Sequence, residues 1–357
     1  IANRGEIAVR IIRACQEMGI ETVAVYSDED ADAMHVRLAD YSYNIGPADA
    51  SESYLNIDAL MEAAERTEAD AVHPGYGFLS EDADFAEMVT KAGMTWIGPW
   101  ADTIRKVGDK DEARAAMIPS GIPMSKGSTP LTSVEDAVEQ AKDVGYPIIL
   151  KPVAGGGGKG MLIANSEDDL RNILTIIDIN KVKYYFEHYI EHSRHIEVQI
   201  VADNYGHVIH LGERECSLQR RNQKLLEESP SIALTPDRRA EVGALAIKAA
   251  KSVHYNNIGT VEFLLDLKTN QFNFMEINPR IQVEHGVTEA VTGIDLVRTQ
   301  IRIAAGESLD LQQEDVKFTG HAIECRINAE DPDNNFMPSP GKIDFFLEPG
   351  GPRVRVD

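Results

Sequence analysis

Three oxygen-bearing side chains, those of Glu262, Glu276 and Asn278, could together bind Mg²⁺ or Mn²⁺ in the stretch TVEFLLDLKTNQFNFMEINPR. Alternating apolar runs on both sides of residues 268–270 predict a β-hairpin. With its turn centred on Thr269, the hairpin brings Glu262 and Glu276 face to face, with Asn278 on the same side of the sheet. Because facing like charges destabilise a sheet, the pair indicates a bound divalent cation. An exposed face with unrelated acids is the alternative, which the large apolar neighbours disfavour.

Charged side chains that could bind an anion and move a proton follow this hairpin. Arg280, Glu284 and His285 lie in RIQVEHGVTE, where a cation and a carboxylate beside a metal–phosphate site suggest anion binding and proton transfer. A structural salt bridge is the alternative. Upstream basic residues predict the local positive field that an anionic substrate needs, or else a solvated strand edge: Arg214, Arg220, Arg221 and Lys224.

A run of four glycines in KPVAGGGGKGM, residues 151–161, could close backbone N–H groups over phosphate oxygens. It is not a Walker A loop, because Lys159 is followed by Gly160 and not by Ser or Thr. Apolar flanks predict strand, loop and strand, a hairpin whose glycine tip covers a ligand. A flexible, exposed hairpin is the alternative.

The composition is that of a soluble globular protein. Its 357 residues could form two or three domains, and the net charge of −23 argues against nucleic acid as a partner. No apolar stretch approaches about 18 residues, so no membrane span is expected. Cys15, Cys216 and Cys325 are far apart and are predicted to be buried, unpaired residues, which suits a reducing compartment.

The elements that must position these groups divide the chain into parts. Strand and helix patterns alternate over residues 1–97 and predict an open parallel sheet. Residues 98–124 resemble a helical linker, and residues 125–189 a small domain with the glycine hairpin. Residues 190–357 combine many β-type runs with helices at DRRAEVGALAIKAAKSV and DLVRTQIRIAAG, which predicts an α+β region with a largely antiparallel sheet. Both ends are expected to be incomplete, because the chain starts and stops within strand-like runs.

Motifs along the whole chain resemble those of biotin carboxylase, the ATP-grasp component of biotin-dependent carboxylases that act on acetyl-CoA, propionyl-CoA, methylcrotonyl-CoA or pyruvate. They are IANRGEIAVRIIRAC, HPGYGFLSE, GDK, GGGGKGM, RHIEVQ, ERECSLQRR, MEINPRIQVEH and GHAIECRINAEDP. The resemblance implies an ATP-grasp fold of mixed α/β and α+β class. Residues 1–97 would be a Rossmann-like domain, 98–124 a linker, 125–189 a mobile lid, and 190–357 a catalytic domain without the family's C-terminal part.

The resemblance also implies roles for individual residues. Contacts with ATP are implied for Lys110, Lys151, Gly157, Gly158, Glu187, His188, Tyr189, Ile190, His195, Gln219, Asn222 and Leu264, together with Glu262 and Glu276. A bicarbonate pocket is implied for Lys224, Arg280, Gln282, Val283 and Glu284. Arg355 matches the arginine that steadies the biotin enolate, with Tyr76 near biotin. Glu262, Glu276 and Asn278 match the family's metal ligands, in agreement with the hairpin argument.

In the chemistry that the resemblance implies, Glu284 takes the proton of bicarbonate, which attacks the γ-phosphate of MgATP or MnATP. The carboxyphosphate formed breaks to CO₂ and phosphate in a closed site, and phosphate removes the N1 proton of biotin so that its enolate attacks CO₂. The implied partners are a biotin carboxyl carrier, a carboxyltransferase and a second copy in a homodimer, with no nucleic acid and no membrane. The implied location is the cytoplasm, or the mitochondrial matrix in a eukaryote.

Three positions depart from the family's usual residues: Asn222 stands for His, His188 for Lys and Gly286 for Pro. These departures put ATP affinity and lid order in question more than the fold. Two other functions stay open, a carbamoyl-phosphate-synthetase-type ligase that also phosphorylates bicarbonate, and a catalytically weak structural subunit of a carboxylase complex.

Overall fold

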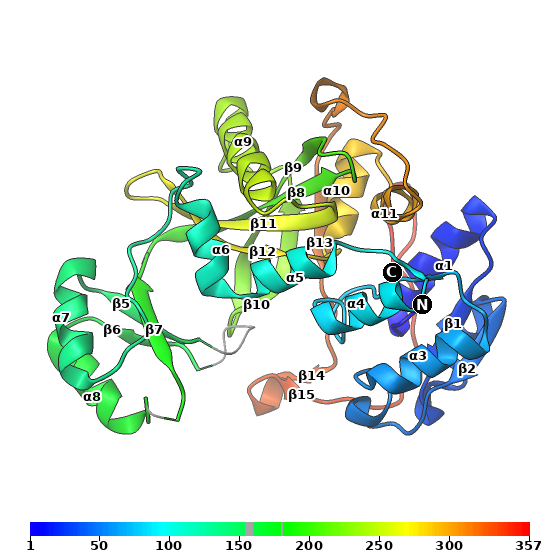
Figure 1. Cartoon of the computed structure of the whole chain (residues 1–357), viewed down its shortest axis with the longest axis horizontal. Coiled ribbons are helices and arrows are strands. Elements are labelled where there is room, and N and C mark those ends of the chain that lie inside the picture. Colours follow the sequence, from blue (N-terminus) through cyan, green and yellow to red (C-terminus); the bar gives the residue numbers. More distant parts are fainter. Residues whose placement is uncertain (154–159, 180) are drawn as a thin grey trace.

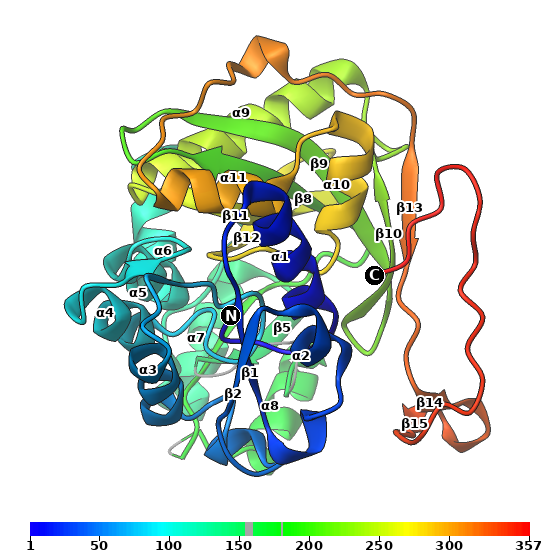
Figure 2. The same ribbon diagram turned by 90° about the vertical axis from the view of Figure 1, so that its right-hand side faces the viewer.

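The computed structural model describes residues 1–153, 160–179 and 181–357, which form three parts around a central β-sheet (Figure 1). An N-terminal part lies on one side of the sheet, and a small three-stranded part with two helices extends on the other (Figure 1). After the last strand of the sheet the chain runs away from the sheet and then returns along an extended segment, so that the C-terminus lies beside the sheet again (Figure 2). The predicted mixed α/β and α+β class is confirmed, whereas the predicted domain boundaries stay predictions. Among the described residues, no helix is long and apolar enough to cross a bilayer.

The N-terminal part contains two pairs of short parallel strands, and not the single open sheet that was predicted. Ile1 and Ala2 lie between the pairs, since the Ile1 amino group donates to the Val23 carbonyl (2.8 Å) and the Ala2 N–H to that of His73 (2.9 Å). The strands are β1 (Val23–Tyr26), β2 (Tyr41–Asn44), β3 (Ala71–Val72) and β4 (Thr95–Trp96). The helices are α1 (Gly5–Met18), α2 (Met34–Leu38), α3 (Ile57–Arg66) and α4 (Ala83–Lys91), with 3-10 turns at Asp28–Asp30 and Ala50–Glu52.

Two helices come next along the chain, and a small part with an antiparallel sheet and two further helices follows them. The predicted hairpin around the glycine run is present as antiparallel pairing of the strands that flank it, and the run itself, with Gly157 and Gly158, lies outside the described residues. The Ser133 and Ser166 hydroxyls cap the two helices of this part, each by accepting a backbone N–H. The elements are α5 (Ala101–Gly108), α6 (Lys110–Met117), α7 (Val134–Val144), β5 (Ile148–Pro152), β6 (Leu162–Ala164), α8 (Glu167–Ile176) and β7 (Tyr184–His188).

A six-stranded antiparallel sheet in the order β12-β11-β8-β9-β10-β13 forms the centre, as predicted. The strands are β8 (Ser193–Ala202), β9 (Val208–Arg220), β10 (Gln223–Ser229), β11 (Asn257–Asp266), β12 (Phe272–Asn278) and β13 (Ala322–Cys325). Helix α9 (Pro236–Ser252) covers one face, where Ala246 and Ala250 belong to the same buried core as Val198 and Phe263 (Figure 1). The remaining elements are α10 (His285–Thr292), α11 (Leu296–Ala304), a 3-10 turn at Gln313–Asp315, β14 (Glu330–Asp331), a 3-10 turn at Pro332–Asn334 and β15 (Met337–Pro338).

Helix α10 and the exposure of one cysteine differ from the predictions. HGVTEAVT contains a glycine and four β-branched residues, which lowers its intrinsic helix propensity, and buried contacts of Val287 and Val291 stabilise the helix instead. Cys15 and Cys216 are buried as predicted, but Cys325 is exposed because it ends the edge strand β13.

The β11–β12 hairpin has the predicted pairing of Glu262 with Glu276, but a bulge produces it. Next to the turn, Leu265 pairs with Phe272, which places the turn centre half a residue before the predicted one. Met275 is then left without a partner, and beyond it the register shifts so that the two glutamates face each other. The predicted register is therefore confirmed at the glutamates and wrong at the turn.

Candidate active site

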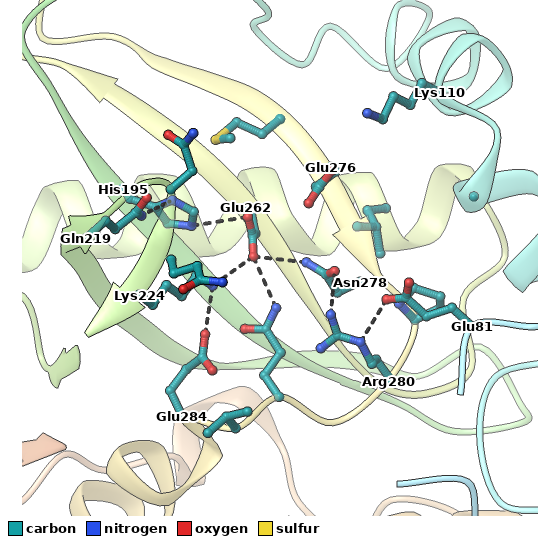
Figure 3. Close-up of a pocket in the computed structure, with 18 of the residues that line it drawn as sticks. Glu81, Lys110, His195, Gln219, Lys224, Glu262, Glu276, Asn278, Arg280 and Glu284 are labelled. Carbon is teal, nitrogen blue, oxygen red and sulfur yellow. Dashed lines mark hydrogen bonds and ion pairs between the residues drawn. The ribbon is translucent and has the colours of Figure 1, made fainter. Parts of the chain in front are cut away.

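A cavity of about 920 Å³ lies where the parts of the molecule meet. Its walls come from the central sheet, the start of α6, β5 and the segment that follows β13, so that Lys110, Lys151, Lys224 and Arg326 all line it. Lys110 and Lys224 lie on opposite sides of the facing glutamates (Figure 3). Such a volume is typical of a site for a small-molecule ligand. The several cations on its wall suit an anionic ligand in a chain whose overall charge is negative.

Lys224 lies at the centre of a buried charge cluster in this cavity (Figure 3). Its ammonium group donates to Glu284 (2.7 Å), Glu262 (3.0 Å) and Glu197 (2.5 Å). Burial would lower the pKa of Lys224, but the three carboxylates outweigh burial and raise that pKa well above its ordinary value. The three carboxylates therefore favour the protonated form of Lys224.

The facing glutamates of β11 and β12 experience different charges. Burial would raise the pKa of Glu262, but Lys224 and His195 outweigh it and hold that pKa far below its usual range. Burial, and next the charge of Glu262, raise the pKa of Glu276. A divalent cation between the two would supply the positive charge that keeps Glu276 ionised. The residues present therefore fit a metal site.

Asn278, the third predicted ligand, belongs to the same cluster. Its side-chain amide donates to Glu262 (3.0 Å), and its oxygen accepts from Arg280 (3.1 Å) (Figure 3). Arg280 also forms an ion pair with Glu81 (2.8 Å). The structural salt bridge considered for Arg280 is thus present, yet the same side chain lines the cavity.

Glu284 is held between two cations. One carboxylate oxygen accepts from Lys224 (2.7 Å), and the other accepts from Arg326 (2.8 Å). Glu284 directly precedes α10, where the backbone N–H groups of a helix start favour a negative charge. With Gln282 and Val283, which also line the cavity, Glu284 completes the predicted anion pocket next to the proposed metal ligands.

Arg326 is a site residue that the sequence analysis missed, whereas Arg355 lies elsewhere. Arg355 pairs with Glu289 (2.6 Å) and Asp357 (2.5 Å), and within the described residues it is not part of the cavity wall. Tyr76, the other residue predicted near biotin, donates to Glu6 and is also absent from that wall. The geometry therefore brings Arg326, and not Arg355, next to Glu284.

Glu197 was also missed, and it explains why the predicted basic cluster is only partly correct. Cross-strand pairing aligns Arg214, Glu197, Glu262 and Glu276 on adjacent strands. Arg214 is fully buried and donates to Glu197 (2.5 Å), so its charge is neutralised inside the protein. Arg220 pairs with Glu330, and Arg221 donates to the Asn335 carbonyl. Of the four basic residues, Lys224 is the one found on the described cavity wall.

The residues predicted to contact the nucleotide fall into two described groups. The first lines the cavity: Lys110, Lys151, Glu187, His195, Gln219 and Asn222, with Glu262 and Glu276. The second is absent from the described wall: His188, Tyr189, Ile190 and Leu264. Lys151 and Arg114 both donate to Glu187 (2.6 Å each), which fixes that carboxylate at the cavity wall. Met161, Tyr185 and Met275 supply apolar surface that the sequence analysis did not assign.

The turn between β9 and β10 explains why an asparagine suits position 222. Asn222 follows Arg221 in this two-residue turn, and both residues have positive φ (52° for Arg221 and 63° for Asn222). Two-residue hairpin turns with positive φ at both positions favour asparagine, because its side chain tolerates the left-handed region. The departure from histidine thus suits the turn that positions the start of β10.

Comparison with known protein families divides the chain into three matched segments. Residues 1–104 match the family described as "Biotin carboxylase, N-terminal domain", and residues 324–357 match "Biotin carboxylase C-terminal domain". Residues 109–312 match "Carbamoyl-phosphate synthase L chain, ATP binding domain". The rival ligase considered above therefore shares the middle segment, while both flanking matches are to biotin carboxylase.

Individual proteins that resemble this chain are also biotin carboxylases. Biotin carboxylase 1 of Bacillus subtilis (strain 168) is 56% identical over an alignment 364 positions long, which covers 100% of this chain and 81% of the relative. The crystal structure of a biotin carboxylase–βγ-ATP complex from Campylobacter jejuni has a TM-score of 0.94 and 48% identity, covering 99% of this chain and 80% of that one.

A third relative is the biotin carboxylase domain dimer of Hydrogenobacter thermophilus 2-oxoglutarate carboxylase, solved with MgADP, ADP and bicarbonate. It has a TM-score of 0.93 and 49% identity, covering 98% of this chain and 78% of that one. These matches confirm the predicted ATP-grasp fold. The chain belongs to the biotin carboxylase family, the ATP-dependent ligases that carboxylate biotin.

Proposed function

We propose that the cavity phosphorylates bicarbonate with ATP and then carboxylates biotin, with Glu284 as the base. The observation that carries this assignment is the position of Glu284, held by Lys224 (2.7 Å) and Arg326 (2.8 Å) on the wall that the facing glutamates also line. Lys224 and Arg326 fix the Glu284 carboxylate at the cavity wall, where it could accept the proton of a bicarbonate bound within hydrogen-bond reach. Arg280, with Gln282 and Val283, would hold bicarbonate on the other side.

The cations would bind the phosphates. Lys110 and Lys151 line the cavity and are proposed to contact the nucleotide, and Lys224 would neutralise the charge that develops when bicarbonate attacks the γ-phosphate. Mg²⁺ or Mn²⁺ held by Glu262, Glu276 and Asn278 would supply further charge neutralisation when bound. The glycine run with Gly157 and Gly158 is proposed to close over the phosphates.

Biotin would bind on the side of Arg326. A guanidinium that stabilises the biotin enolate must reach the place where CO₂ would be released, and Arg326 lines the cavity next to the proposed base Glu284. Arg355 was the sequence-based candidate for this role. We assign the role to Arg326 on the geometry, with Arg355 held outside by Glu289.

The partners follow from the reaction. A carboxylated biotin must be handed on, so the proposed partners are a biotin carboxyl carrier and a carboxyltransferase. A homodimer is proposed because the relative from H. thermophilus was solved as a biotin carboxylase domain dimer. The proposed location is the cytoplasm, or the mitochondrial matrix in a eukaryote, because this reaction requires soluble ATP and bicarbonate.

The test measures phosphate release and carboxybiotin formation on the same samples of the full-length protein. Glu284→Gln should lose both activities. Arg326→Ala should lose about a hundredfold in carboxybiotin formation, the effect of removing one charge-stabilising contact, while keeping some bicarbonate-dependent phosphate release. Arg355→Ala is the matched control and should keep both. A larger loss of carboxybiotin formation in Arg355→Ala than in Arg326→Ala would return the enolate role to Arg355.

A further inference from the structure

Another pair of facing carboxyl groups lies at the opposite edge of the central sheet from Glu262 and Glu276. Glu227 on β10 is the cross-strand partner of Glu324 on β13. Glu227 is completely buried, and one of its carboxylate oxygens has no hydrogen-bond partner among the described residues. Like charges in this arrangement destabilise a sheet, so the pair needs a compensating group.

Arg326 is that group, and it connects the pair to the cavity. Its Nε–H donates to Glu227 (2.7 Å), and its terminal N–H donates to Glu284 (2.8 Å). Its backbone N–H donates to the Leu225 carbonyl (3.0 Å), which fixes the base of the side chain. The guanidinium is thus held at both ends, on one side by the proposed base and on the other by Glu227, which does not belong to the described cavity wall.

Glu324 favours this arrangement because it does not compete for Arg326. Burial, and next the charges of Glu227 and Glu284, raise the pKa of Glu324 to about 8, while Arg326 and Arg214 oppose the shift. Two other groups lie close. Tyr76 is one of them, since burial and next Glu6 raise the pKa of its hydroxyl and the charge of Glu324 adds to this effect. Arg355 is the other, since a Cβ on Gly286 would lie 3.4 Å from Glu324 and 3.7 Å from Arg355. At neutral pH Glu324 is therefore mainly protonated, which leaves Arg326 shared between Glu227 and Glu284.

We propose that Glu227, paired with Glu324, is a positioning residue that aims the Arg326 guanidinium at the Glu284 side of the cavity. Glu227 touches neither substrate and acts through Arg326 alone. The proposal rests on the proposed function, because the direction in which Arg326 points matters only if Arg326 serves the reaction. Its physical basis is that a charged side chain must be held close to the productive geometry by its own contacts.

The test compares variants that separate the length of the Glu227 side chain from its charge. Glu227→Gln keeps the length and an oxygen that accepts from Nε, whereas Glu227→Asp keeps the charge but draws Arg326 away by one methylene. We expect Glu227→Asp to lower kcat for carboxybiotin formation by about tenfold to a hundredfold, and Glu227→Gln to stay within about threefold of the parent. The KM for MgATP should not change in either variant. Glu228→Gln is the matched control. Glu228 is the next residue after Glu227 on β10, and it pairs with His321 (3.0 Å) and not with Arg326.

Each outcome of this test either supports or overturns the positioning role of Glu227. If Glu227→Gln loses more activity than Glu227→Asp, charge matters and not position, and the proposal is wrong. If kcat per folded molecule is unchanged in both while the melting temperature drops, Glu227 has a structural role only. A parent protein without bicarbonate-dependent phosphate release and without carboxybiotin formation would instead overturn the proposed function. Both variants retain a polar group of similar size at residue 227, so they test positioning without opening a large cavity.

Discussion

The two edges of the central sheet each carry a pair of facing glutamates, but the charges are compensated in different ways. At the β11–β12 edge, Lys224 compensates Glu262, and Glu276 remains available for a divalent cation. At the β10–β13 edge, Arg326 compensates Glu227, and Glu324 retains a proton, since burial and the neighbouring acids raise its pKa to about 8. At the first edge Glu276 can take an ion from outside, whereas at the second edge Arg326 supplies the positive charge, although burial still raises the pKa of Glu227.

The difference explains the division of tasks along the cavity. A pair that is left short of positive charge can bind a cation, and the cation brings phosphate oxygens with it. A pair that already contacts an arginine of the same chain can hold that arginine in one orientation. Glu284 lies between the two edges and contacts the cation of each, Lys224 and Arg326. We infer that it links phosphate chemistry on one side to biotin chemistry on the other.

Removing the cation of the first edge should have the largest effect. Lys224→Met leaves Glu197, Glu262 and Glu284 without their shared partner, and uncompensated buried charges are strongly destabilising. We expect bicarbonate-dependent phosphate release to fall by about a thousandfold, and the free energy of unfolding to fall by about 3 kcal/mol or more. Phosphate release and urea unfolding measure these losses, with the exposed Lys251→Met as control. Phosphate release above a tenth of the parent level would contradict the central role of Lys224.

The metal requirement should distinguish the two pairs directly. Glu276→Gln removes a proposed ligand, so the Mg²⁺ concentration for half-maximal phosphate release should rise by about tenfold or more. Without metal the same variant should melt at a higher temperature than the parent, because burial and Glu262 already raise the pKa of Glu276 and disfavour its charge. Titrations with Mg²⁺ and thermal melts measure both effects. Glu227→Gln, at the other edge, should leave the metal requirement unchanged, and an equal shift in both variants would remove the distinction.

The sequence could predict the first pair and not the second because of the distance along the chain. Glu262 and Glu276 belong to one hairpin, so a short turn brings them together. The predicted turn centre was half a residue too late, but the bulge at Met275 shifts the register so that the two glutamates still face each other. Glu227 and Glu324 face each other only because β13 returns to pair with β10 after several intervening elements. No local pattern encodes that pairing.

The same limit explains the two arginines. Arg326 and Arg355 both lie near the end of the chain in strand-like sequence, and composition does not distinguish them. Arg326 directly follows β13, whose pairing with β10 carries it to the cavity, while Arg355 follows a long extended segment (Figure 2). The sequence could predict that an arginine serves this part of the site. Which of the two arginines lies there depends on the pairing of β10 with β13, which is distant in sequence.

The smallest expected effect concerns the proton of the second pair. Burial, and next Glu227 and Glu284, raise the pKa of Glu324 to about 8 in the folded protein, compared with about 4.3 for an unperturbed glutamate in the unfolded chain. Between these values the folded state binds more protons than the unfolded state, so the free energy of unfolding falls as pH rises toward 8. Glu324→Gln cannot release a proton and should lack this decrease.

The measurement is urea unfolding of parent and variant across pH 5 to 9, with Glu314→Gln at an exposed position as control. The two curves should differ in slope by up to about one proton between pH 5 and 8, and become parallel above that range. Groups that do not interact with Glu324 contribute equally to both proteins and cancel in the difference, which therefore reports on Glu324 and the acids coupled to it. Parallel curves over the whole range would mean that Glu324 is ionised in the folded protein. The second edge would then carry the same uncompensated charge as the first, and the contrast between the two edges would fail.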